Sequence, residues 1–197
     1  MVRFADDAIF CFQYRREAEM FYVSFHKRLA KFGLEMAEEK TKLIEFGRFA
    51  EENRKKANGG KPDTFDFLGF THYCDKSRNG KFMVKRKTSK KKFKASLAKT
   101  KAWLRKNLTT PIKTVMRKLN VKLRGYYQYY CMWENWYMVS NYLDGVKKLL
   151  FKMMNRRSQK RSVNWSQYIR FLKRYPLIKP KVYVNMSEFK PNISYLV

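Results

Sequence analysis

The chain has 197 residues and carries 45 Lys and Arg against 16 Asp and Glu, which gives a formal net charge of +29. Hydrophobic residues make up 45% and aromatic residues 17%, enough apolar material for a core, so a wholly disordered chain is excluded. No stretch approaches the ~20 apolar residues that a membrane-spanning helix needs. The N-terminus lacks a signal-peptide pattern, and three widely spaced cysteines suggest no disulfide framework. We therefore expect a reduced, cytoplasmic protein with no membrane partner.

The positive charge is confined to the C-terminal part of the sequence. Residues 1–75 hold 13 basic and 13 acidic residues, whereas residues 76–197 hold 32 basic and 3 acidic ones. Like charges repel in a folded protein, so an excess of this size indicates a polyanionic partner. Aromatic residues lie among the basic ones, as in 124–130, and such rings stack on bases while Lys and Arg reach phosphates. The pattern favours nucleic acid over an anionic membrane surface.

The first 49 residues predict a hairpin, a helix and a further strand. Two short apolar runs flank Asp6-Asp7, which predicts a β-hairpin with the carboxylates at its turn. Apolar residues then recur at three- and four-residue spacing from Ala18 to Phe32, which predicts a helix ending at Gly33. The alternation in 43–46 predicts a second strand region.

Residues 50–63 are polar and glycine-containing, and we expect a loop there. The aromatic run 65–73 predicts a strand or a tight hairpin, Asn79-Gly80 predicts a turn, and 81–87 predicts the returning strand. We expect the domain boundary between residues 85 and 92, with domains at 1–87 and 88–197.

The second domain is expected to be helical. Apolar spacing predicts helices over 89–106, from Thr110-Pro111 onward, and over 136–155, with a shorter helix at 166–174 and an extended tail after it. The fold class predicted from the whole pattern is α+β: a small region of antiparallel hairpins with one helix, then a basic three-helix bundle.

The adjacent carboxylates Asp6 and Asp7 carry the most suggestive chemistry. Carboxylates bind Mg²⁺, and metal-assisted phosphoryl transfer uses two ions a few ångströms apart. One hairpin cannot supply all the ligands for two ions. On spacing alone a plain surface turn, in which Asp is favoured, remains the alternative.

The order of several motifs resembles the group II intron-encoded reverse transcriptases, which also act as maturases. Phe4-Ala5-Asp6-Asp7 is similar to their YxDD box, with Phe for Tyr. The segments 32–36 and 39–42 are similar to the next polymerase block, and 65–70 to the primer-grip hairpin. The segments 119–130 and 155–157, with Trp165, resemble the maturase-specific thumb. The resemblance covers nearly the whole chain, and implies a partial polymerase palm followed by a thumb-like bundle.

The resemblance also implies roles for individual residues. Asp6 would be a Mg²⁺ ligand of a complete enzyme and Asp7 a weaker one, and Lys40 would lie near the incoming triphosphate as a third catalytic residue. The primer grip would comprise Phe67, Leu68 and Gly69. Nucleic-acid contacts are expected from Lys85, Arg86, Lys87, Lys90, Lys91, Lys92, Lys94, Arg124, Tyr127, Arg156, Arg157, Lys160 and Arg161. For the lysine run a solvated helix face is the alternative, and some of the tyrosines at 126–130 are expected in the core.

The family's fingers and first metal-binding aspartate precede its YxDD box, whereas this sequence begins three residues before Phe4. We therefore expect no appreciable DNA synthesis by the chain alone. It would be a gene remnant, one half of a split enzyme that reassembles with the other half or as an oligomer, or a binding protein. The expected partner is RNA, intron RNA above all, with a DNA primer or target as a further candidate.

Three functions remain open at this point. The first is the C-terminal part of an RNA-directed DNA polymerase that also assists intron splicing. The second is a non-catalytic, maturase-like RNA-binding module. The third is a generic basic nucleic-acid-binding protein, such as a ribosome-associated factor.

Overall fold

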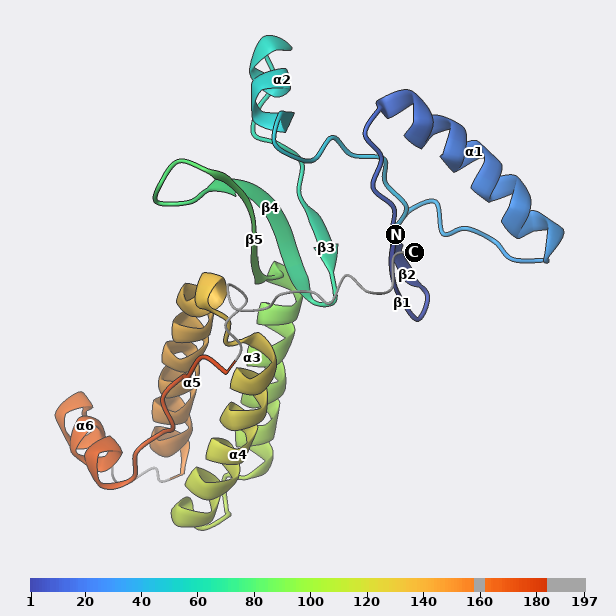
Figure 1. Ribbon diagram of the computed structural model, residues 1–197. Helices are drawn as coiled ribbons and strands as arrows, with labels where there is room; N and C mark the ends of the chain where they lie inside the picture. The colour runs from blue at the N-terminus through green and yellow to red at the C-terminus, as the bar shows by residue number, and fades with distance from the viewer. Residues whose placement is uncertain (158–161, 184–197) are drawn as a thin grey trace. The chain divides into compact units, whose positions relative to one another are not determined.

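The computed structural model describes residues 1–157 and 162–183, and its fold is α+β (Figure 1). The chain divides into two compact units. The first unit comprises Met1–Leu68 and His72–Lys85, and the second comprises Gly69–Thr71 and the chain from Arg86 onward. The predicted boundary between residues 87 and 88 lies within a strand that runs from one unit into the other.

The first unit begins with a two-stranded antiparallel hairpin. Strand β1 (Val2–Phe4) pairs with β2 (Asp7–Ile9), and Phe4 lies opposite Asp7. The predicted hairpin is confirmed, but its two-residue turn is Ala5-Asp6, and Asp7 already belongs to the second strand. Ala5 has a φ of +50°, a left-handed conformation that disfavours residues with a Cβ atom.

Helix α1 (Arg15–Lys31) follows the hairpin, as predicted. Phe21 and Phe25 occur four residues apart on one face, and the ring of Phe10 packs on both, with centroid distances of 4.6 and 5.3 Å. The helix ends at Lys31 with Phe32 as its C-cap, and Gly33 turns the chain with a φ of +67°. A small aromatic cluster thus holds the helix against the preceding segment.

Two predictions for the first unit are wrong. The segment 43–46 forms no strand, although its residues alternate, because alternation predicts a strand only where a partner strand pairs with it. Within the predicted loop 50–63 lies helix α2 (Ala50–Lys56). Its sequence has no apolar stripe, but it places Glu in the first turn and Lys and Arg in the last, which suits the helix dipole. The ion pair between Lys55 and Glu51 adds i,i+4 support.

A three-stranded sheet with the order β3-β4-β5 connects the units. Strands β3 (Phe65–Phe67) and β4 (Phe70–Lys76) form a tight hairpin, one of the two alternatives predicted for this segment, and β5 (Phe82–Thr88) is the predicted returning strand. Gly80 has a φ of +72° in the turn between β4 and β5, where Ser77 and Lys81 exchange backbone and side-chain hydrogen bonds.

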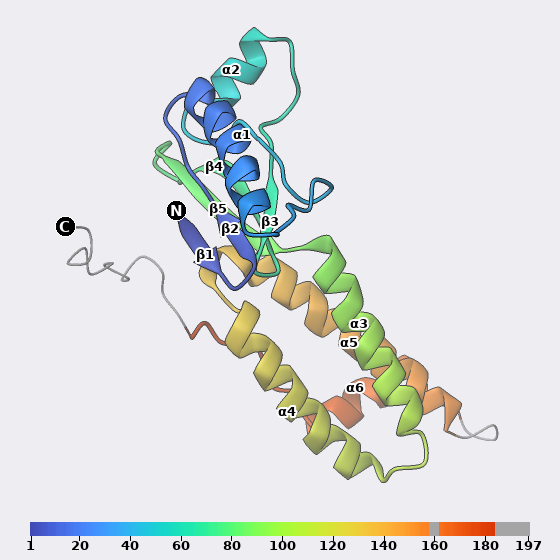
Figure 2. The ribbon, with the colours of Figure 1, turned by 90° about the vertical axis from the view of Figure 1, so that its right-hand side faces the viewer.

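The second unit is built from helices α3 (Lys90–Lys106), α4 (Ile112–Tyr130), α5 (Trp136–Arg156) and α6 (Trp165–Arg174), with a short 3-10 turn η1 (Trp133–Asn135) before α5. Helices α3, α4 and α5 lie side by side along their lengths (Figure 2). The predicted bounds of α3, α5 and α6 are confirmed to within one residue, and for α4 the sequence predicts only the start. Helix α4 begins one residue later than predicted, because Pro111 accepts the first helical hydrogen bonds and so occupies the N-cap.

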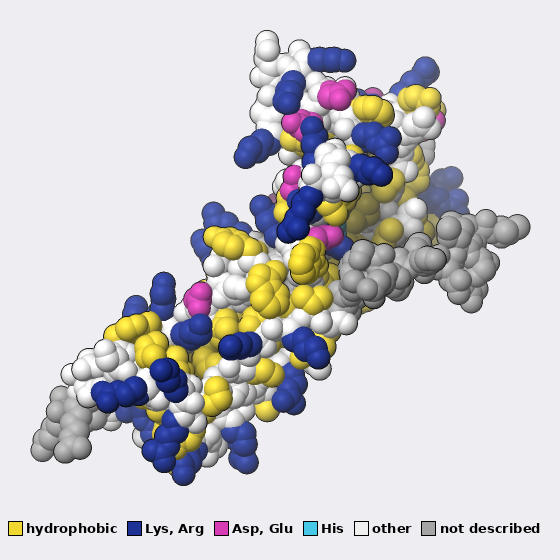
Figure 3. Space-filling model, turned by 60° about the vertical axis from the view of Figure 1, so that its left-hand side comes forward, with side chains coloured by type: hydrophobic (Ala, Val, Ile, Leu, Met, Phe, Trp, Pro, Cys, Tyr) yellow, Lys and Arg dark blue, Asp and Glu magenta, His cyan; other side chains and the backbone are white. Residues whose placement is uncertain are grey.

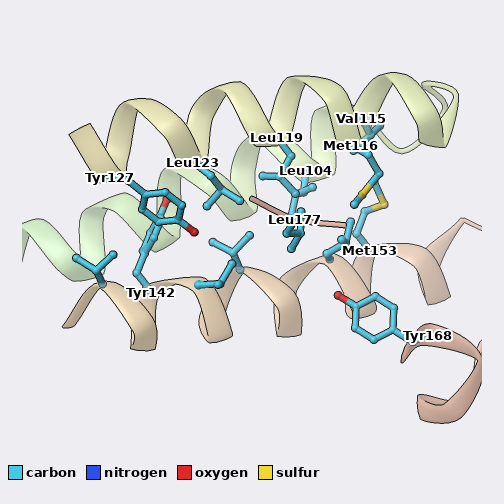
Figure 4. Close-up of a cluster of buried hydrophobic side chains, with 14 of the residues drawn as sticks. Leu104, Val115, Met116, Leu119, Leu123, Tyr127, Tyr142, Met153, Tyr168 and Leu177 are labelled. Atoms are coloured by element: carbon cyan, nitrogen blue, oxygen red, sulfur yellow. The ribbon is translucent and has the colours of Figure 1, made fainter. Parts of the chain in front are cut away.

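A continuous apolar core fills the space between these helices (Figure 4). The i, i+3, i+4 pattern of α4 places Leu119 and Leu123 inward, and both are 1% exposed. Helix α5 contributes Val139, Val146 and Leu150, each fully buried. Leu104 from α3, Tyr168 from α6 and Leu177 from the segment after α6 complete the cluster.

Two asparagines fix the connections of this unit. The buried Asn135 side chain donates to Thr88 Oγ1 at 2.7 Å and to the Tyr130 carbonyl at 2.8 Å, and it accepts from the Thr88 N–H at 2.7 Å. Asn120 on α4 donates to the Pro176 carbonyl at 3.0 Å and accepts from the Ile178 N–H at 2.9 Å. The segment after α6 is therefore held along α4.

Candidate nucleic-acid interface

The second unit is strongly basic at its surface. Residues 86–157 and 162–183 contain 25 Lys and Arg and two carboxylate side chains, Glu134 and Asp144. Both carboxylates are paired, Glu134 with Arg86 at 3.2 Å and Asp144 with Lys147 at 2.9 Å. Figure 3 shows Lys and Arg spread over the visible face of the helical unit with few carboxylates among them. A polyanion would neutralise this charge and release counterions on binding.

The first turn of α3 concentrates this charge. Lys90, Lys91 and Lys92 are exposed there, as is Lys94 at the start of the next turn, and the first turn holds no acidic residue. Ser89 caps the helix by accepting from the Lys92 N–H. Cations at a helix N-terminus oppose the helix dipole, at a cost of roughly 0.3–1 kcal/mol each. A bound phosphate would reverse this cost, because helix N-termini and lysines both attract anions.

The N-terminal end of the predicted lysine run has structural partners instead. Lys85 pairs with Asp75 at 2.8 Å, and a hydrogen bond from Lys85 lowers the pKa of the Asp75 carboxyl. Arg86 directs both its backbone N–H and its guanidinium to Glu134, whose side chain is only 14% exposed. Lys87 is exposed at the end of β5. The run therefore splits into a half-buried part, Lys85 and Arg86, and an exposed part from Lys87 onward.

The other predicted nucleic-acid contacts differ in exposure. Arg124 and Arg156 are exposed on α4 and α5, and Arg157 donates to the Thr110 carbonyl at 2.8 Å. The prediction that Tyr127 contacts nucleic acid is wrong, because its side chain is fully buried. Burial raises the pKa of Tyr127, and its hydroxyl donates to the Ile178 carbonyl at 3.1 Å. This side chain belongs to the core. Lys160 and Arg161 lie outside the described residues.

The predicted catalytic residues lie at exposed positions of the first unit. Asp6 is in the hairpin turn, Asp7 opens β2, and Lys40 lies in a turn where its N–H donates to the Ala37 carbonyl at 3.0 Å. Within residues 1–157 and 162–183, no group of three His, Cys, Asp or Glu side chains is placed to hold a metal ion. The two adjacent carboxylates by themselves do not fit a complete two-Mg²⁺ site.

The predicted primer-grip residues form the turn between β3 and β4. Phe67 ends β3, and Leu68 and Gly69 both have positive φ, +49° and +80°. A Cβ atom on Gly69 would lie 3.1 Å from the Tyr130 hydroxyl, and the Gly69 carbonyl accepts from the Ser89 N–H at 3.0 Å. Glycine is therefore needed here for the turn and for the approach of Tyr130.

The sequence reasoning missed Glu134 and Asn135, which bond Arg86 and Thr88 within the second unit. One signal was present for Glu134, because it is one of only three acidic residues in 76–197 and a lone carboxylate among cations is expected to be paired.

No family model matches the chain, and neither a curated protein nor a solved structure matches it. Within the described part of the chain, no helix has both the length and the apolar character required to cross a membrane.

Proposed function

We propose that the chain is the C-terminal portion of a group II intron-type reverse transcriptase and maturase, and that its second unit binds intron RNA. The observation that carries the proposal is the excess of Lys and Arg on a well-packed helical unit, with 25 cations against two paired carboxylates in its described residues. The proposal assigns the hairpins of the first unit to a partial palm and helices α3 to α5 to the thumb.

The unfavourable placement of lysines at the start of α3 supports RNA binding more specifically. Lys90 and Lys94 are four residues apart and Lys91 and Lys94 three apart, so they repel along the helix surface by roughly 0.2–0.5 kcal/mol per pair. The same lysines oppose the dipole of α3. A local conflict of this kind, with no carboxylate in the turn to relieve it, is typical of a functional site.

The hairpin of β1 and β2 carries the two adjacent carboxylates. We propose that Asp6 and Asp7 are the metal ligands that this chain contributes to a larger site. Two adjacent carboxylates do not complete a cage for two ions, so nucleotidyl transfer by the described residues alone is not part of the proposal.

RNA binding is tested by fluorescence anisotropy with a structured group II intron RNA and a random duplex of equal length, over a series of salt concentrations. We expect log Kd to rise linearly with log salt concentration and the structured RNA to bind more tightly. The double variant Lys91→Gln/Lys94→Gln should weaken binding and reduce the salt slope by about 2, because two phosphate contacts are lost.

Lys27→Gln/Lys31→Gln is the matched control, since it removes the same charge from exposed positions on α1. Equal weakening by both double variants would contradict a specific role for α3. Equal affinity for both RNAs would favour the generic nucleic-acid-binding protein. Asp6→Ala should leave RNA affinity unchanged or slightly tighter, as expected for a carboxylate that does not contact the RNA.

A further inference from the structure

A hollow of about 310 Å³ lies on the surface of the second unit, between one face of α5 and the segment after α6. Its volume is at the lower end of the range of roughly 300–1,000 Å³ that ligand pockets span. All of its lining residues belong to the second unit. They are Trp136, Ser140, Leu143, Asp144, Lys147, Lys179 and Pro180.

Both walls of the hollow are fixed by the fold. On α5, the lining positions recur at i, i+4, i+7, i+8 and i+11, so they form one stripe of the helix. On the other side, Lys179 and Pro180 directly follow Ile178, whose N–H and carbonyl are both bonded to α4. Leu177 is 9% exposed in the core. The hollow is therefore preformed.

The side chains of the hollow combine an aromatic face with polar groups of both signs. Trp136 is 45% exposed, which is a large area for a residue that usually lies inside. Asp144 is the more exposed of the two carboxylates in the described part of this unit, and it pairs with Lys147 at 2.9 Å with 60% of its side chain accessible. Lys147 and Lys179 add two cations to the wall.

This combination suits a nucleotide better than a peptide or a small anion. Indole rings stack on bases of any sequence, and lysines reach the phosphate. A carboxylate accepts hydrogen bonds from base edges, and its two oxygens can accept from two adjacent donors. Guanine presents N1–H and N2–H₂ side by side, whereas uracil offers one donor. The cationic surroundings disfavour a partner protein unless that protein is acidic.

We propose that the hollow holds one unpaired nucleotide of a bound RNA, preferably guanosine, with the base on Trp136, its donor edge on Asp144 and its phosphate beside Lys179. The inference rests on the proposed RNA binding and adds a single-strand subsite to it. Bases within a duplex are stacked on their neighbours and cannot enter such a hollow, so only unpaired positions qualify.

The test uses the full chain and four versions of one RNA hairpin: blunt, or with a single unpaired 3′ G, A or U. Anisotropy at fixed salt should show the G overhang binding about tenfold more tightly than the blunt hairpin, because a base stacked on an aromatic side chain adds affinity. Trp136→Ala should abolish this gain without changing blunt-hairpin affinity. Trp136→Phe, which preserves the packing of the helix start, should retain part of it.

Trp133→Ala is the matched control, because Trp133 is 72% exposed near the same helix start but does not line the hollow. Trp133→Ala should keep the full gain in affinity from the G overhang. Asp144→Asn should remove the preference for the G overhang over the A overhang, and the A overhang should still bind more tightly than the blunt hairpin. Trp136→Ala and Asp144→Asn together separate stacking from recognition of the base edge.

Three results would overturn the inference. If the blunt hairpin binds but no overhang adds affinity, the subsite is absent while RNA binding stands. If no RNA binds, the proposed function fails together with the inference. If Trp136→Ala changes the sedimentation coefficient of the chain and leaves overhang binding intact, the hollow is an interface between protein copies.

Discussion

The two units of the chain are folded by different means. In the second unit, residues from four helices and a following segment form one buried cluster. In the first unit, Ala18 and Ala50 are the only fully buried residues, and large apolar side chains such as Phe4, Phe32 and Leu34 are 57–69% exposed. Local elements hold the first unit together: a tight hairpin, an aromatic cluster and ion pairs along α2.

The same division separates the charges. The first unit holds 17 basic and 13 acidic residues, and the described residues of the second hold 25 and two. A large core offsets the repulsion within an excess of surface charge of one sign, since burial of apolar area is the dominant favourable term in folding. The cationic surface proposed to bind RNA thus belongs to the unit with the larger buried core.

The largest expected effect comes from core truncation in the second unit. Leu123→Ala should lower the free energy of unfolding by about 2–5 kcal/mol, because Leu123 is 1% exposed and its loss leaves a cavity. Leu34→Ala in the first unit should change it by less than about 0.5 kcal/mol, since Leu34 is 57% exposed. Denaturant unfolding followed by circular dichroism measures both. Equal losses would contradict the difference in core packing between the two units.

A smaller effect is expected at the buried asparagine. Asn135→Ala removes three hydrogen bonds and leaves the Thr88 N–H without this partner, which should cost about 1–3 kcal/mol. Asn53→Ala is the control in the first unit, because its amide bonds the Glu45 carboxylate at an exposed position. Thermal unfolding of both variants compares them, and a melting temperature for Asn135→Ala as high as that of the control would refute the stabilising role of the bonds between Thr88 and Asn135.

The smallest effect concerns a surface ion pair of the first unit and its pH dependence. Lys85 lowers the pKa of Asp75, so the pair stabilises the folded state above the unfolded pKa of about 3.9 and loses its effect as pH falls through the lowered value. Asp75→Asn should therefore cost below about 1 kcal/mol at pH 7 and nothing at pH 2. A double-mutant cycle with Lys85→Gln measures the coupling, and a coupling that persists at pH 2 would contradict it.

The helices of the second unit could be predicted from the sequence because their apolar residues follow one period, as Val115, Leu119 and Leu123 do in α4. Helix α2 could not be predicted in this way, since charge placement rather than apolar spacing stabilises it. The exposed lysines of α3 were predicted from their density alone. Tyr127 could not be distinguished from its neighbouring tyrosines, because its burial comes from contacts between distant elements, and its hydroxyl bonds Ile178, 51 residues away in the sequence.

Hydrogen–deuterium exchange of the full chain, with and without structured intron RNA, tests the central claim most directly. The account predicts slow exchange in α4 and α5, fast exchange in α1 and α2, and RNA-dependent protection that is largest in the second unit, at the start of α3. Uniform exchange across both units, or RNA-dependent protection confined to the first unit, would contradict it.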